Sequence, residues 1–225
     1  MNRKQIIRII IDICMTICLL MLMAYSLVGE KAHEWIGMAM LILFVTHHIL
    51  NRKWIAGVFK GKYTLFRIIQ TILVIVMLVL MAGSMVSGIL LSEYLFKLLK
   101  IFGISEIANR IHIFCAYWGF VIMSLHLGFH WNMVVGMISR KFKKTSMLRR
   151  WLVRLPIPFL AANGIYVFYK RQIGSYLLMK MHFVFYDFGE SVITYIFDYM
   201  AAMILIAVIG YYFGLVLRKN SLRKR

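Results

Sequence analysis

The chain has 225 residues, of which 62% are hydrophobic and only 16% are charged. Soluble domains average about 25% charged residues, and one soluble core cannot bury so large an apolar fraction. The composition therefore excludes an ordinary soluble domain and predicts an all-α polytopic membrane bundle, because helices satisfy their backbone groups internally in lipid.

Apolar stretches long enough to cross a hydrocarbon core of about 30 Å recur along the whole chain. We predict about six transmembrane helices, at residues 8–28, 33–51, 67–91, 110–136, 151–169 and 190–216. The first follows Arg3 and Lys4 and resembles a signal peptide. Its apolar run from Ile6 to Met23 exceeds the usual core of about 7–15 residues, so we expect a retained first helix.

The basic residues gather in alternate connections of this arrangement. Most of the 27 lysines and arginines lie in the N-terminus, the second–third connection, the fourth–fifth connection and the C-terminus. Positively charged segments stay cytoplasmic, so a multi-pass protein with both termini in the cytoplasm is expected. The net charge of +19 then reflects topology and attraction to anionic membrane lipid, with no need for a nucleic-acid partner.

Four of the seven histidines form two matched pairs. His33 and His47 lie fourteen positions apart on the second predicted helix, and His112 and His126 lie fourteen apart on the fourth. Fourteen residues turn an α-helix by about 1400°, within about 40° of four whole turns, and advance it by about 21 Å. Each pair therefore shares one helix face, with its members near opposite membrane surfaces.

Both helices run from outside to inside in the predicted topology. His33 can then face His112 in the outer leaflet, and His47 can face His126 in the inner leaflet. Two imidazoles from facing helices are typical axial ligands of a low-spin haem. A single buried histidine is more often hydrogen-bonded to a carbonyl, but two matched pairs favour two haems b. The three cysteines form no C-x-x-C-H motif for covalent haem attachment, and structural zinc would need four protein ligands.

Further residues are candidate haem or quinone contacts. His48 competes with His47 as the inner ligand, although its spacing from His33 is about 60° off the same face. The candidate contacts are His48, His130, Asn51, Arg110 and Lys97 outside, Arg52 inside, and the small residues Gly37, Gly88, Gly119 and Gly128 that would make room for haem. His182 is expected to have no ligand role.

The chain is predicted to divide into two regions. Residues 1–138 form a four-helix, di-haem-binding membrane core. Residues 139–225 form a two-helix membrane region with a basic cytoplasmic loop and an outer interfacial segment at 175–187. Pro156 and Pro158 lie early in the fifth span and are expected to kink or delay that helix.

The ligand pattern of the second and fourth helices resembles cytochrome b of the respiratory bc complexes. Four stretches of the chain resemble the flavinylation-associated cytochromes, a family of small bacterial di-haem membrane cytochromes. These stretches are His47–Trp54, Ser87–Ser92, His126–Trp131 and Gly164–Arg171 followed by Tyr176-Leu177-Leu178. The resemblance implies His33, His47, His112 and His126 as haem ligands in a bacterial cytoplasmic membrane. It also implies electron transfer from the quinone pool to an extracytoplasmic flavoprotein or another redox partner.

Two other functions remain open at this stage. The chain could be the haem-bearing membrane anchor of a quinone-linked dehydrogenase or reductase, and no catalytic residue is predicted for either cytochrome function. A metal or proton transporter could use the histidines along a pathway, although acids within the spans are scarce. Asp12 and Asp198 are the candidates.

Overall fold

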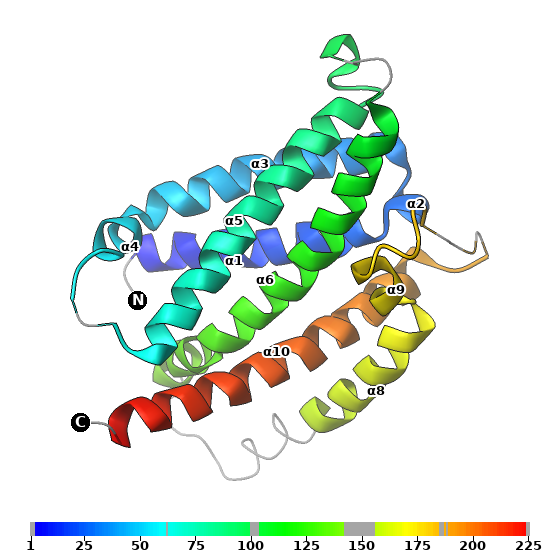
Figure 1. Ribbon diagram of the computed structural model, residues 1–225. Coiled ribbons are helices and arrows are strands. Elements are labelled where there is room, and N and C mark those ends of the chain that lie inside the picture. The colour runs from blue at the N-terminus through cyan, green and yellow to red at the C-terminus, as the bar shows by residue number, and fades with distance from the viewer. Residues whose placement is uncertain are drawn as a thin grey trace.

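The computed structural model describes residues 3–61, 63–99, 104–141, 156–184, 187 and 189–223. Across these residues the chain forms helices and no strands (Figure 1), which confirms the predicted all-α polytopic bundle. The helices are α1 (Arg3–Met23), α2 (Tyr25–Val28), α3 (Glu30–Leu50), α4 (Arg52–Gly57), α5 (Leu65–Leu91), the 3-10 helix η1 (Lys97–Leu99), α6 (Ser105–Lys141), α8 (Pro156–Lys170), α9 (Ile173–Leu177) and α10 (Val192–Arg223).

Five of the described helices are long and apolar enough to cross a membrane. They are α1, α3, α5, α6 over Ser105–Trp131 and α10 over Val192–Lys219. The remaining predicted span, 151–169, overlaps α8, which has 15 residues and is shorter than the roughly 20 that an upright crossing requires. Residues 151–155 of that prediction lie outside the described residues. The helix begins at Pro156, where proline costs nothing because first-turn amides lack intrahelical partners.

Two helix boundaries differ from the predictions in ways that affect the histidines. Gly29, with φ at 83°, separates α2 from α3 in a conformation that favours glycine, so α3 begins at Glu30 and His33 lies one turn inside it. The helix predicted at 110–136 begins five residues earlier, at Ser105, so His112 lies two turns inside it. Glu106 in the first turn favours this earlier start through its charge at the positive end of the helix dipole.

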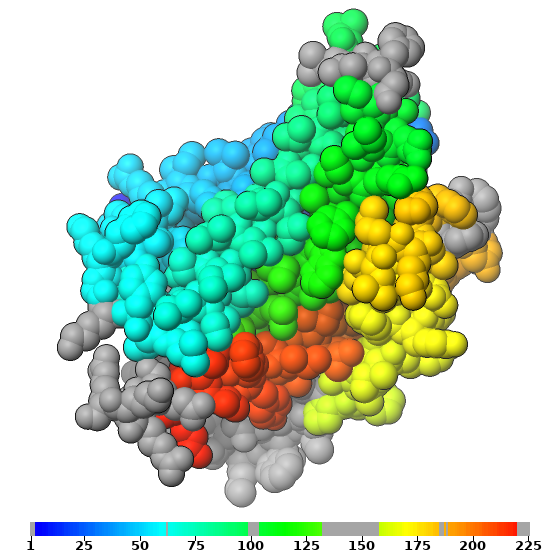
Figure 2. All heavy atoms as spheres, viewed as in Figure 1, coloured from blue at the N-terminus to red at the C-terminus, as the bar shows by residue number. Residues whose placement is uncertain are grey.

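The helices pack in a sequence of neighbouring pairs. α5 lies along α6, α6 along α10 and α10 along α8, while α1 pairs with α3. Figure 2 shows α5, α6, α10 and α8 as one continuous surface on the viewed face. The α1–α3 pair is packed more loosely against this group, and Met40 is the one buried residue of α3.

Glycines allow the closest approaches within the tightly packed group. A Cβ added to Gly128 on α6 would lie 2.1 Å from the carbonyl oxygen of Ala207 on α10. A Cβ at Gly164 on α8 would lie 2.6 Å from the carbonyl oxygen of Ala201. Gly128 therefore serves helix packing of the kind common in membranes, and the expectation that it makes room for haem is wrong.

The two ends of the bundle differ in what they contain. α1 begins and α10 ends at the same end, which we call the termini end (Figure 1). The opposite end, with α2, η1 and α9, is called the loop end. There Arg171 donates to Glu190 and to Asp198, and thereby joins the end of α8 to α10. The hydrogen bonds from Arg171 hold the pKa of Glu190 below its ordinary value.

Candidate functional site

His33 and His112 face each other at the loop end. Their imidazole ring centroids are 6.0 Å apart, and the rings are inclined at 72°. Imidazole nitrogens bind a metal at about 2.0–2.1 Å, so two ligands on opposite sides of one metal have ring centres about 6 Å apart. The observed separation therefore fits two axial ligands of a single iron.

The hydrogen bonds of the two rings are unequal. The Nδ1 atom of His112 lies 3.0 Å from the carbonyl oxygen of Ser84 and 3.2 Å from the hydroxyl oxygen of Ser87. A carbonyl accepts only, so His112 carries its proton on Nδ1 and leaves Nε2 as the basic nitrogen. Nδ1 of His33 is buried and, among the described residues, has no hydrogen-bond partner.

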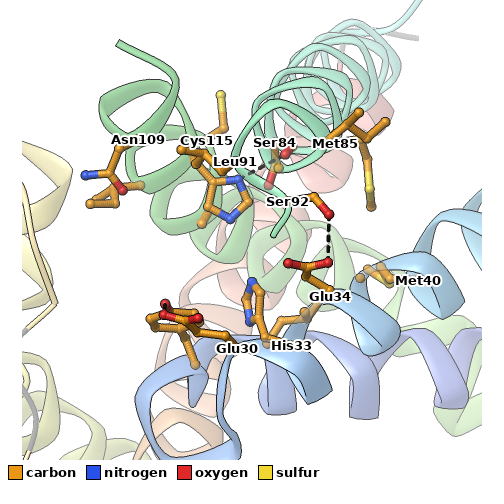
Figure 3. A pocket seen from close by; sticks show the side chains of 18 of the residues that line it. Glu30, His33, Glu34, Met40, Ser84, Met85, Leu91, Ser92, Asn109 and Cys115 are labelled. Carbon is orange, nitrogen blue, oxygen red and sulfur yellow. Dashed lines mark hydrogen bonds between the residues drawn. The ribbon is translucent and has the colours of Figure 1, made fainter. Parts of the chain in front are cut away.

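A cavity of about 530 Å³ contains both rings and lies between α3, α5 and α6, with residues of α1 and α2 completing its wall (Figure 3). This volume is within the range of about 300–1,000 Å³ typical of cofactor pockets. Gly37 and Gly119 line the cavity, and a Cβ added to either would meet no atom within 4 Å. A Cβ at Gly88 would instead lie 3.2 Å from Cε1 of His112, so Gly88 lets α5 approach that ligand ring.

The charged side chains that line the cavity are carboxylates. Glu30, Glu34 and Glu93 line it, and the described residues that line it include no lysine or arginine. The expected contact from Arg110 is not brought here, because Arg110 forms an ion pair with Glu106 at 2.8 Å and does not line the cavity.

Glu34 fixes the loop that follows α5 against α3. Its carboxylate accepts a hydrogen bond from the Ser92 hydroxyl at 2.7 Å, drawn in Figure 3. It also accepts from the backbone N–H groups of Glu93 at 2.7 Å and Leu95 at 2.9 Å. Hydrogen bonds to a charged group contribute about 1.5–3 kcal/mol each, so this carboxylate closes the loop-end cavity with a firmly held loop.

The second histidine pair lies at the termini end. Nδ1 of His47 donates to Oδ1 of Asp12 on α1 over 2.7 Å. His47 lies within electrostatic range of His126. Nδ1 of His126 is buried and has no partner in the described part of the chain. In each pair of facing histidines, one ring has a hydrogen-bonded Nδ1, in His112 or His47, and the other has a buried Nδ1 without a partner among the described residues, in His33 or His126.

The other candidates surround this second pair in different ways. His48 turns back on its own helix, with Nδ1 2.8 Å from the carbonyl oxygen of Phe44. His130 accepts a hydrogen bond from Gln70 at 2.9 Å, and its ring centroid lies 4.6 Å from that of His126.

Two candidates follow the end of α3. The side-chain amide of Asn51 lies 3.4 Å from Nε2 of His47 and donates to the His47 carbonyl. Arg52, at the start of α4, is exposed.

Sequence reasoning missed the role of α1. Asp12 bonds His47, and Arg8 donates from Nη2 to the carbonyl oxygen of Leu50 at 2.6 Å. Both residues lie within one turn of each other, on the face of α1 that meets the end of α3. An acid inside an apolar span is costly and marks a functional position, and that signal was present in the sequence.

The described residues do not form a metal site built from several protein ligands. They contain no group of three or more histidine, cysteine, aspartate or glutamate side chains that could hold a metal ion. A haem needs only two protein ligands, because the porphyrin supplies the rest. His182 contributes its backbone carbonyl, which accepts from Asn109 at 2.9 Å.

Comparison of the chain with protein-family models, with curated proteins and with solved structures finds no match in any of the three. The two histidine pairs are therefore the feature of the chain that indicates its function.

Proposed function

We propose that this membrane protein transfers electrons across the bilayer through two haems b. The observation that carries the proposal is the pair His33 and His112, 6.0 Å apart in a cavity of about 530 Å³. His47 and His126 would hold the second haem at the other end of α3 and α6. Haem, when bound at these positions, supplies reversible one-electron chemistry.

The chain's own residues support this function by orienting the histidine rings and by leaving space beside them. The Ser84 carbonyl fixes the proton of His112 on Nδ1, and Asp12 does the same for His47, so that Nε2 of each ring is directed away from these partners. Gly37 and Gly119 leave space beside the ligand rings of the loop-end site. The fourteen-residue spacing sets the two sites about 21 Å apart along the helices.

The surroundings of this function are also part of the proposal. We infer that both termini lie in the cytoplasm, from the positions of the basic residues. The resemblance to flavinylation-associated cytochromes implies a bacterial cytoplasmic membrane. The loop-end haem would then face the outside. Its electrons would come from the quinone pool and pass to an extracytoplasmic flavoprotein or another redox protein, as the resemblance to flavinylation-associated cytochromes implies.

The test is a reduced-minus-oxidised absorption spectrum of the detergent-purified protein, with a pyridine haemochrome assay for stoichiometry. We expect two haems b per chain, and one in either His112→Ala or His47→Ala. A folded protein that lacks haem absorption, purified from haem-sufficient cells, would contradict the proposal and favour a transporter that uses the histidines along a pathway.

A further inference from the structure

The proposed function gives Asp12 one role, which is to keep the proton of His47 on Nδ1. It lies nine residues after the start of α1, within the apolar run of a membrane-spanning helix. A carboxylate inside a membrane span is costly. That cost calls for a compensating interaction, and the 2.7 Å contact with Nδ1 of His47 is one.

We propose that Asp12 is a positioning residue of the termini-end haem: it accepts the Nδ1 proton of His47, directs Nε2 to the iron and lowers the reduction potential of that haem. This inference rests on the proposed function. Metal-bound histidines commonly donate their second ring N–H to a carboxylate, which fixes the tautomer and raises the basicity of the ligand. A more basic ligand stabilises ferric over ferrous iron, and lowers the potential.

The contact also distinguishes between the two adjacent histidines. His48 bonds Nδ1 to the Phe44 carbonyl of its own helix, one turn earlier. His47 alone of the two reaches a carboxylate on another helix. His47 also lies within electrostatic range of His126.

Two positively charged groups near the termini-end site, Arg8 and Arg218, would raise the reduction potential of its haem, whereas Asp12 would lower it. Arg8 lies one turn earlier on α1, and its Nη2 atom is committed to the Leu50 carbonyl. The charge of Asp12 also interacts with His130, as does that of Arg218, which donates to the carbonyl oxygen of Phe129 on α6. These cations raise the potential of a nearby haem, so the effect of Asp12 is measured as a difference between variants that keep them.

The experiment is a spectroelectrochemical titration of the purified protein and of Asp12→Asn. The neutral amide keeps the shape of the side chain but cannot act as an anionic acceptor. We expect one midpoint potential to rise by about 59 mV or more, equivalent to a tenfold change in the equilibrium constant of a one-electron couple. The other midpoint should stay where it is, and so serves as an internal control in the same molecules.

Single-haem backgrounds assign the shift. In His112→Ala, which is expected to keep the termini-end haem, Asp12→Asn should move the remaining potential upward. In His47→Ala, which is expected to keep the loop-end haem, it should not. Two bound haems with unchanged potentials in Asp12→Asn would overturn the inference while leaving the proposed function intact. A shift in the His47→Ala background would overturn it as well.

Asp12→Glu provides a second, conservative variant in case Asp12→Asn loses a haem. If Asp12→Asn binds one haem and Asp12→Glu binds two, the carboxylate is required for the site and the inference is supported. If both variants bind one haem, the inference is overturned, because a carboxylate at position 12 then does not keep the termini-end haem in place. Absence of haem from the unaltered protein is a separate result that contradicts the proposed function.

Discussion

At each end of the bundle a histidine of α3 lies near a histidine of α6, but the surroundings of the two pairs differ. At the loop end, His112 bonds a neutral carbonyl, and the cavity wall carries Glu30, Glu34 and Glu93 without lysine or arginine among the described lining residues. At the termini end, His47 bonds the carboxylate of Asp12, and Arg218 lies within electrostatic reach of His130.

The two ends therefore differ in where the carboxylates lie: on the cavity wall at the loop end, and in contact with a histidine ring at the termini end. In the loop-end site the negative charges lie on the cavity wall, where the carboxylate of Glu34 bonds the loop after α5. In the termini-end site the negative charge contacts Nδ1 of His47 directly. The same fourteen-residue spacing on α3 and α6 therefore gives the two histidine pairs different surroundings, and each end can be altered separately.

We expect the largest effect from a substitution that fills the loop-end cavity and leaves the termini end unchanged. Gly119→Leu places a branched side chain in the open space beside His33 and His112, where a Cβ alone meets no atom within 4 Å. We expect the variant to bind one haem instead of two, measured by the pyridine haemochrome assay.

Two controls accompany this variant. Gly119→Ala adds only the Cβ and should keep two haems. Gly128→Ala should lower the thermal stability of the whole bundle, because its Cβ would lie 2.1 Å from the Ala207 carbonyl oxygen. Two haems in Gly119→Leu would show that the cavity is not a haem site.

A second prediction separates the adjacent histidines of the termini end. His48→Ala removes a ring that bonds its own helix at Phe44, so we expect two haems per chain and unchanged potentials. His47→Ala removes the ring bonded to Asp12, so we expect one haem. The opposite result, one haem in His48→Ala and two in His47→Ala, would exchange their roles and remove Asp12 from the ligand's surroundings.

The smallest expected effect concerns the hydroxyl at the loop end. Ser87→Ala removes the 3.2 Å contact with Nδ1 of His112 but leaves the Ser84 carbonyl at 3.0 Å. Loss of a second-shell partner commonly weakens metal binding about 10–100-fold, and the remaining carbonyl should keep the loss below about tenfold. Haem retention during dilution checks this, with Asp12→Asn as the comparison at the other end. A larger loss in Ser87→Ala would mean that the hydroxyl, and not the carbonyl, orients His112.

The sequence indicated more about the helices than about the spaces between them. The positions of α3, α5 and α10 follow from apolar length, and the fourteen-residue spacing of His33 and His47 follows from helix geometry. The start of α6 was predicted five residues late, because the polar first turn at Ser105–Asn109 lowers the local hydropathy without ending the helix. The role of Gly128 was misassigned, since a glycine serves packing or open space according to what faces it.

By itself, the sequence determined the class of this protein: a helical membrane bundle in which two helices each carry two histidines fourteen residues apart. Those features depend on composition and on periodicity within single helices, which local geometry fixes. Only the tertiary structure decided that Ser84 faces His112, that Asp12 faces His47 and that the loop-end cavity carries acids. These contacts join residues on different helices, and they depend on how each helix is rotated and placed against its neighbours, which no single segment encodes.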